Sequence, residues 1–128
     1  MPTLTKQPVK KLALSIPEKA VLKSCKQTLD YYRAMRKLDY FRITTTGKPV
    51  PGGRFAPNPD QAGFPDLLIW LCNGLDLYVE VKRPGGQLSD KQKTFKARAE
   101  SFGKRFFLVE SSTKLQQLLE LYLSERPY

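Results

Sequence analysis

Three charged side chains interrupt two runs of sequence that are otherwise largely apolar. Asp66 lies in the run "GFPDLLIW" at residues 63–70, and Glu80 and Lys82 lie in "LYVEVKRPGG" at residues 77–86. Moving a charge out of water is costly unless the charge is paired or binds a metal ion. We therefore expect an ion or a charged partner to be held by these residues.

The absence of histidine limits the chemistry that these residues can perform. None of the 128 residues is a histidine. Imidazole is essential to Ser-His-Asp and Cys-His triads, to histidine general bases and to the usual zinc sites, so these classes are excluded. Hydrolysis by this chain would have to use carboxylates, lysine and hard metal ions.

The charge distribution indicates a polyanionic partner. The formal net charge is +10, and residues 1–62 carry 12 Lys or Arg against 4 Asp or Glu, whereas residues 63–128 carry 10 against 8. Such an excess favours nucleic acid, because each phosphate contact releases counterions; a well-solvated basic surface is the alternative. No apolar run reaches the roughly 18 residues of a membrane span, so we expect a cytoplasmic protein without a membrane segment.

The pattern along the chain predicts one α/β domain, residues 15–128, behind a basic tail, residues 1–14. The expected order is a helix, three strands, a helix, a strand and a C-terminal helix, which indicates a central mixed sheet of about four strands flanked by helices. The expected helices span 16–37, 90–102 and 113–124, the strands 40–46, 66–72, 76–82 and 105–110, and a long loop spans 47–63.

The first helix is expected to have a core face and a basic face. Spacings of three and four place Glu18, Leu22, Cys25, Leu29 and Tyr32 on one stripe. The second stripe is basic and consists of Lys19, Lys23, Lys26, Asp30, Arg33 and Lys37.

Two further predictions concern burial. The cysteines, Cys25 and Cys72, are too few for a disulfide framework and are expected to be buried free thiols. Trp70 lies in a continuous apolar run that is typical of a strand buried on both faces, so it is expected in the core.

The residues around the three charges form a recognisable pattern. Pro65 and Asp66, followed by Glu80, Val81 and Lys82, match the PD-(D/E)XK signature, and "GFPDLL" and "VEVKRPGGQLSDKQ" extend the match. Over residues 18–110 the chain resembles the VRR-NUC family of the PD-(D/E)XK nuclease superfamily, in its small stand-alone type. The resemblance implies a restriction-endonuclease-like core of order αβββαβ. It also implies a Mg²⁺-dependent nuclease, with Mn²⁺ able to substitute and no organic cofactor.

The resemblance also implies roles for individual residues. Asp66 and Glu80 would hold the metal together with the Val81 carbonyl, because Mg²⁺ prefers oxygen ligands and keeps several waters. Lys82 would orient the attacking water or stabilise the transition state. In the family, a glutamate at the place of Glu18 joins the acidic cluster and a glutamine at the place of Gln92 lies in the active site.

Each of these residues also has a purely structural interpretation. Glu18 could complete a capping box with Ser15, the expected N-cap of the first helix, and Gln92 could do the same with Ser89. Glu80 and Lys82 could lie on an exposed strand face. Asp66 could be a turn residue after proline.

The connection between the two strands decides whether the acids share a face of the sheet. A two-residue turn at Asn73 and Gly74 would pair residue 66 with residue 81 and direct Asp66 away from Glu80. Because a shared metal needs both carboxylates on one face, we predict a three-residue connection at 73–75 or a bulge beside the site.

Basic side chains outside the site are candidates for phosphate contacts. The basic side chains of the first helix could instead form only a solvated surface. Those in or near the loop can adapt to a substrate, and arginine binds phosphate bidentately. The candidates are Lys19, Lys23, Lys26, Arg42, Lys48, Arg54 and Arg83.

Short members of the family tend to come from phages and bacteria and to pair as homodimers. By resemblance, we predict a homodimeric DNA endonuclease that is selective for branched DNA, such as a four-way junction or a flap. A non-catalytic DNA-binding module and a small RNA-binding protein of the ribosomal type also fit the charge. The second of these would prefer structured RNA without metal dependence.

Overall fold

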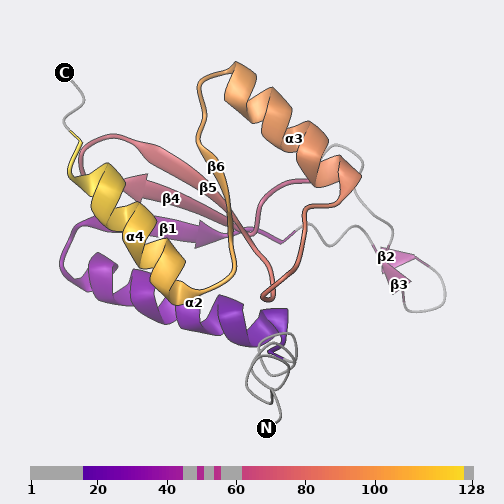
Figure 1. Ribbon diagram of the computed structural model, residues 1–128, viewed down its shortest axis with the longest axis horizontal. Helices are drawn as coiled ribbons and strands as arrows, with labels where there is room; N and C mark the ends of the chain where they lie inside the picture. The colour runs from indigo at the N-terminus through magenta and orange to yellow at the C-terminus, as the bar shows by residue number, and fades with distance from the viewer. Residues whose placement is uncertain (1–15, 45–48, 51–53, 56–61, 126–128) are drawn as a thin grey trace, which may run out of the picture.

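The helices and the strands of the main sheet follow one another along the chain in the predicted order. The computed structural model describes residues 16–44, 49–50, 54–55 and 62–125, so the predicted tail at 1–14 lies outside the described residues. The elements are α2 (Glu18–Ala34), β1 (Leu38–Arg42), β2 (Pro49–Val50), β3 (Arg54–Phe55), β4 (Leu67–Leu71), β5 (Asp76–Val81), α3 (Asp90–Ser101), β6 (Phe106–Val109) and α4 (Ser112–Leu123) (Figure 1).

The main sheet is mixed and has the strand order β1-β4-β5-β6. The first three strands pair antiparallel, and β6 pairs parallel to β5 after the crossover through α3. The α/β fold with an αβββαβ core and a C-terminal helix is thus confirmed, consistent with a restriction-endonuclease-like core. The strands β2 and β3 form a separate antiparallel ribbon within the segment predicted as loop; residues 47–48, 51–53 and 56–61 of that loop lie outside the described residues.

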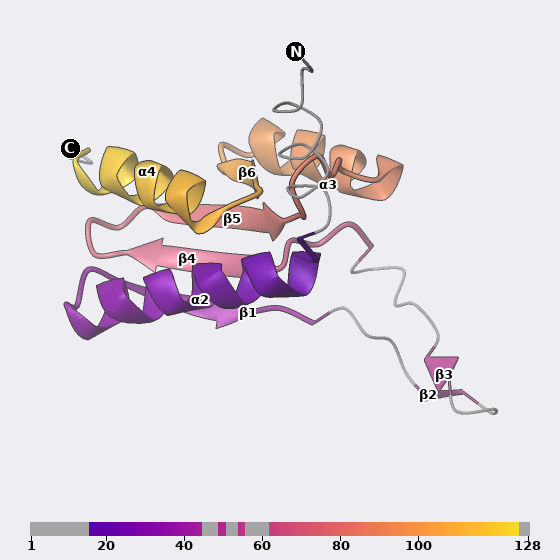
Figure 2. The ribbon, with the colours of Figure 1, turned by 60° about the horizontal axis from the view of Figure 1, so that its bottom comes forward.

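One face of the main sheet packs against α2 and α4. Figure 2 shows these two helices side by side along the sheet, with α3 apart from them. Burying apolar side chains is the main favourable term in folding, and this face is apolar throughout. The core consists of Val21, Cys25, Leu29 and Tyr32 of α2, Leu115 and Leu119 of α4, and the strand residues Leu38, Tyr40, Leu67, Ile69, Leu71, Leu77, Val79, Val81 and Val109.

The opposite face is covered by α3 over β5 and β6. Phe95 of α3 lies with its ring centroid 5.9 Å from that of Phe106 and 6.2 Å from that of Tyr78. Beyond this cover, Trp70 is 51% exposed and lies 4.7 Å from the half-exposed ring of Phe41, centroid to centroid. The prediction that Trp70 lies in the core was therefore wrong, because α3 packs over the β5–β6 half of this face.

The helix ends agree only partly with their predicted caps. Ser89 and Gln92 form the predicted capping box of α3. In α2, however, Pro17 occupies the N-cap position and no side chain caps the helix, so the predicted N-cap, Ser15, was wrong; Ser15 itself lies outside the described residues. The helix ends at Ala34 rather than at residue 37, and β1 begins two residues earlier than predicted.

The two cysteines differ in exposure. Cys25 is buried in the core as predicted, but Cys72 is exposed, because it lies in the connection between β4 and β5 rather than inside a strand. Within the described ranges, no helix combines the length and the apolar character needed to cross a membrane.

Candidate active site

Asp66 and Glu80 lie on the same face of the sheet. The register pairs Leu67 with Val79, and its continuation by one residue sets Asp66 opposite Glu80. Directly opposed residues of antiparallel strands point to the same side. The connection that produces this register has three residues, because the N–H of Leu71 donates to the carbonyl of Leu75 at 2.8 Å. The predicted three-residue length is confirmed, although the connection spans 72–74 rather than 73–75.

The Asp66 carboxylate joins three strands at their ends. Its Oδ2 accepts a hydrogen bond from the backbone N–H of Val81 at 2.9 Å, and its Oδ1 lies 3.7 Å from a guanidinium nitrogen of Arg42. The backbone carbonyl of Asp66 accepts from the N–H of Ile43 at 2.7 Å. These contacts fix the carboxylate beside the end of β5, where Glu80 and Lys82 lie.

The Glu80 carboxylate is almost completely buried, with 5% of its side chain exposed. Its Oε2 accepts a hydrogen bond from Gln92 Nε2 at 2.8 Å and lies 3.5 Å from Lys82 Nζ. Its Oε1 is buried without a hydrogen-bond partner among the described residues. The pKa of the Glu80 carboxyl is raised to about 7, mainly by burial and next by the charge of Asp66, while Lys82 opposes both effects.

Gln92 forms the predicted capping box and also contacts Glu80. Its Oε1 accepts the backbone N–H of Ser89 at 2.8 Å as part of the capping box, while its Nε2 donates to Glu80. The first turn of α3 thereby orients the buried carboxylate. One side chain thus caps α3 and contacts Glu80, and a catalytic role for Gln92 stays a prediction.

Gly63 explains how α3 approaches the site so closely. Its φ is +81°, and a Cβ at this position would lie 2.3 Å from the backbone carbonyl oxygen of Lys91. Both the conformation and the close approach require glycine. The glycine three residues before Asp66 therefore packs the chain against the first turn of α3, which carries Gln92.

The turn after Lys82 depends on a second glycine and on an acid that the sequence analysis missed. A Cβ on Gly86 would lie 2.9 Å from both the Arg83 carbonyl oxygen and the Lys82 Cβ. Glu110 accepts the backbone N–H of Gly85 at 2.8 Å. Glu110 directly follows β6, so the parallel pairing of β6 with β5 is the signal that could have indicated it.

Glu18 is near the acid pair without sharing a contact with it. It is the first residue of α2 and is exposed. Its charge contributes the smallest of the effects that raise the pKa of Glu80. Within the part of the chain that the structure describes, no group of three or more His, Cys, Asp or Glu is close enough to hold a metal. A role for Glu18 in the site stays a prediction.

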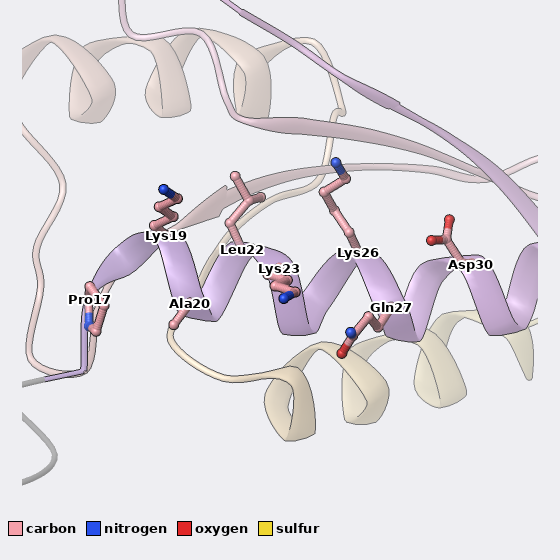
Figure 3. A pocket seen from close by; sticks show the side chains of 8 residues that line it. All are labelled: Pro17, Lys19, Ala20, Leu22, Lys23, Lys26, Gln27 and Asp30. Atoms are coloured by element: carbon pink, nitrogen blue, oxygen red, sulfur yellow. The ribbon is translucent and has the colours of Figure 1, made fainter.

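The predicted nucleic-acid contacts are spread over several elements. Lys19, Lys23 and Lys26 are exposed on α2 and line a hollow of about 640 Å³, and Lys19 and Lys26 extend from the same side of the helix (Figure 3). Arg83 is exposed beside the site, whereas Arg42 faces Asp66. Lys48 lies outside the described residues, and only the backbone of Arg54 is described.

The family comparison covers the part of the chain that carries the acid pair and Lys82. Residues 59–113 match the family model of the VRR-NUC domain. The resemblance to the VRR-NUC family is thereby confirmed. The matched residues run from the segment before Asp66 to the start of α4, and therefore include Glu80, Lys82 and Gln92 but not Glu18. No match was found among curated proteins or among solved structures.

The match has direct consequences for the class of reaction. The VRR-NUC domain is a nuclease domain, so the match over residues 59–113 implies nuclease activity in general, with nucleic acid as the class of substrate. Nucleases of the PD-(D/E)XK superfamily generally use divalent metal ions. The acid pair, Asp66 and Glu80, lies within the matched residues.

Proposed function

We propose that this chain is a metal-dependent DNA endonuclease and that Asp66, Glu80 and Lys82 are its catalytic residues. The observation that carries the proposal is the buried Glu80 carboxylate, opposite Asp66 on one face, with Oε1 unpartnered among the described residues. Burial that raises the pKa of a carboxyl disfavours its ionised form, and ionisation of the buried group therefore opposes folding. Such an arrangement is typical of a functional site, where the charge has a use that offsets its cost.

The donor atoms suit a hard cation. Two carboxylates and the backbone carbonyl of Val81 supply oxygen ligands, which Mg²⁺ and Mn²⁺ prefer, and Mg²⁺ completes its shell with water. Bound there, the ion would supply an activated water and neutralise charge on the phosphate. The Val81 N–H would keep Asp66 oriented, and Gln92 would do the same for Glu80, as their hydrogen bonds at 2.9 and 2.8 Å indicate.

Lys82 supports the reaction through its charge. Its Nζ lies 3.5 Å from Glu80 Oε2, and only 17% of its side chain is exposed. A compact ammonium group in a site sheltered from water stabilises negative charge that grows on a phosphate more strongly than it would in bulk water. We assign to Glu18 a weaker electrostatic role from the start of α2 and to Gln92 the positioning of Glu80.

We further propose that the chain acts on branched DNA as a homodimer, since two active sites can then cut two strands. The exposed aromatic pair, Phe41 and Trp70, supports this arrangement, because aromatic side chains are enriched at protein interfaces and this pair lies on the part of the sheet beyond α3. The second copy of the chain is the partner to which we assign this surface.

Cleavage of labelled linear duplex, flap and four-way junction in Mg²⁺ or Mn²⁺ tests the enzyme. We expect Glu80→Gln and Lys82→Ala each to lower the rate by at least about 100-fold. Lys104→Ala, at the opposite end of β6, is the matched control and should cleave normally. Binding without cleavage by the wild type in either metal would refute the nuclease and leave the binding module. Equal rates on all three DNAs would refute the branched-DNA selectivity.

Light scattering tests the homodimer separately. We expect a dimer for the wild type and a shift to monomer for Trp70→Glu. Tyr31→Glu, which alters an exposed aromatic residue of α2, should stay dimeric. A monomeric wild type at concentrations that support cleavage would contradict the homodimer without affecting the proposed chemistry.

A further inference from the structure

A second basic surface lies on α3, apart from the basic face of α2. A hollow of about 420 Å³ separates the outer side of this helix from the segment that leads into β4. The residues that line it are Ala62, Asp90, Lys91, Thr94, Phe95 and Arg98. We call this surface the α3 groove.

The α3 groove begins beside the acid pair. Ala62 in its wall precedes Gly63, whose α-carbon packs against the backbone of Lys91, and Gln92, the next residue along, donates to Glu80. The same segment reaches Asp66 three residues after Gly63. One end of the groove is therefore connected through the first turn of α3 to the carboxylates of the site.

The groove presents groups that bind phosphate. Lys91, Thr94 and Arg98 are exposed and follow one another at spacings of three and four, which places them along one side of the helix. Neither Lys91 nor Arg98 forms an ion pair with another described residue, whereas Lys96 on the same helix pairs with Glu100 at 3.0 Å. Arginine binds a phosphate bidentately, and lysine and threonine donate to phosphate oxygens as well.

The length of the groove suits a nucleic-acid strand. Seven residues of helix rise by about 10.5 Å, which separates the levels of Lys91 and Arg98 along the axis. This corresponds to about three steps of roughly 3.4 Å along one strand of a duplex. Asp90, the single acid of the lining, lies at the end nearest the carboxylates of the site.

We propose that the α3 groove binds the phosphodiester backbone of the substrate next to the scissile phosphate, so that the strand follows α3 rather than the basic face of α2. The inference rests on the proposed nuclease function and adds the path of the substrate. The reason for choosing α3 over α2 is that the two helices cover opposite faces of the sheet. Gln92 of α3 contacts Glu80, whereas α2 packs its buried residues against the opposite face.

Two double variants with equal charge changes test this path. Both are made in the full chain carrying Glu80→Gln, so that bound DNA stays intact. Lys91→Ala with Arg98→Ala removes two cations from α3, and Lys19→Ala with Lys26→Ala removes two cations with the same spacing of seven residues from α2. Affinity for labelled duplex and four-way junction is measured by fluorescence anisotropy between 50 and 200 mM salt, roughly the range over which phosphate contacts are revealed.

The α3 variant is expected to bind at least about tenfold more weakly and to lower the salt slope by about 2, one for each phosphate contact. The α2 variant is expected to stay within about twofold of its parent. Equal or larger losses in the α2 variant would overturn the α3 path. Failure of the Glu80→Gln parent to bind any DNA would overturn the proposed function as well, which distinguishes the two failures.

Discussion

One face of the main sheet is apolar and closed by α2 and α4, whereas the other carries the acid pair and is covered by α3 over β5 and β6. The same strands supply both faces. Leu67, Ile69 and Leu71 of β4 point to the closed face. Trp70 of β4 and Asp66, which directly precedes the strand, point to the other face. Because side chains alternate along a strand, one sequence can stabilise the fold with every second residue and leave the rest for function.

The two faces also differ in the sign of their contribution to stability. Burial of Leu67 or Leu77 on the closed face is favourable at any pH. Burial of Glu80 on the other face raises the pKa of its carboxyl to about 7, so the ionised form is destabilised in the folded protein. Substitutions on the two faces should therefore separate stability from activity.

The largest effect on stability is expected on the closed face. Leu67→Ala should lower the free energy of unfolding by about 2–5 kcal/mol, because it removes a fully buried side chain and leaves a cavity. Trp70→Ala, three residues away on the other face, should lower it by about 1 kcal/mol or less, since it loses mainly an aromatic pair. Urea denaturation of the reduced protein measures both. Equal losses would contradict the difference between the faces.

The next effect concerns pH. The pKa of Glu80 is raised from 4.5 to about 7 in the folded protein, so between these values the folded state holds a proton that the unfolded state has lost. Stability should therefore fall as pH rises through this window, by up to about 3 kcal/mol from Glu80 alone. The difference between wild type and Glu80→Gln, measured by urea denaturation from pH 4.5 to 8, isolates this contribution.

Glu80→Gln should be the more stable protein at pH 8. Glu100→Gln, which alters an exposed glutamate of α3, should follow the wild type. A wild type that gains stability relative to Glu80→Gln as pH rises would show that the Glu80 pKa is not raised.

A smaller effect tests the junction between α3 and the acid face. Gly63→Ala should cost about 2 kcal/mol more than Gly74→Ala, because both positions have a positive φ but only Gly63 would bring a Cβ into the backbone of α3. We also expect Gly63→Ala to impair cleavage, since it displaces the turn that carries Gln92. Thermal denaturation measures the stability, and equal costs at the two glycines would refute the close approach.

The smallest effect separates helix capping from the site. Ser89→Ala removes the cap that Gln92 N–H contacts and should cost about 1 kcal/mol while leaving cleavage close to that of the wild type. Gln92→Ala should cost a similar amount of stability and also slow cleavage, because Glu80 loses its hydrogen bond. Single-turnover rates of the two variants, measured below their melting temperatures, would contradict this role for Gln92 if they were equal.

The parts of the fold that follow local rules were predictable from the sequence. The capping box at Ser89 and Gln92 indicated the start of α3, and alternation indicated the hairpin of β4 and β5. The requirement that two acids share a face even indicated an odd connection. The grouping of Asp66, Glu80, Lys82 and Gln92 was implied by the resemblance to the VRR-NUC family, and the structure places the four side chains near one another.

The features that the sequence did not predict correctly depend on packing between elements that are far apart in the sequence. The apolar run around Trp70 could not show that α3 packs over β5 and β6. The α3 groove was also missed, because the position of Ala62 beside Arg98 depends on the long-range contact of Gly63 with Lys91. Sequence patterns describe the two sides of an element, but not how far its neighbour extends.

Metal binding by the acid pair tests the account most directly. We would titrate Mn²⁺ into metal-free wild type, Glu80→Gln and Glu100→Gln at pH 8 by isothermal calorimetry, since Glu80 is mostly ionised above a pKa of about 7. The account predicts binding by wild type and Glu100→Gln and an affinity more than about tenfold lower for Glu80→Gln. An affinity that Glu80→Gln leaves unchanged, or a wild type that binds no metal, would contradict it.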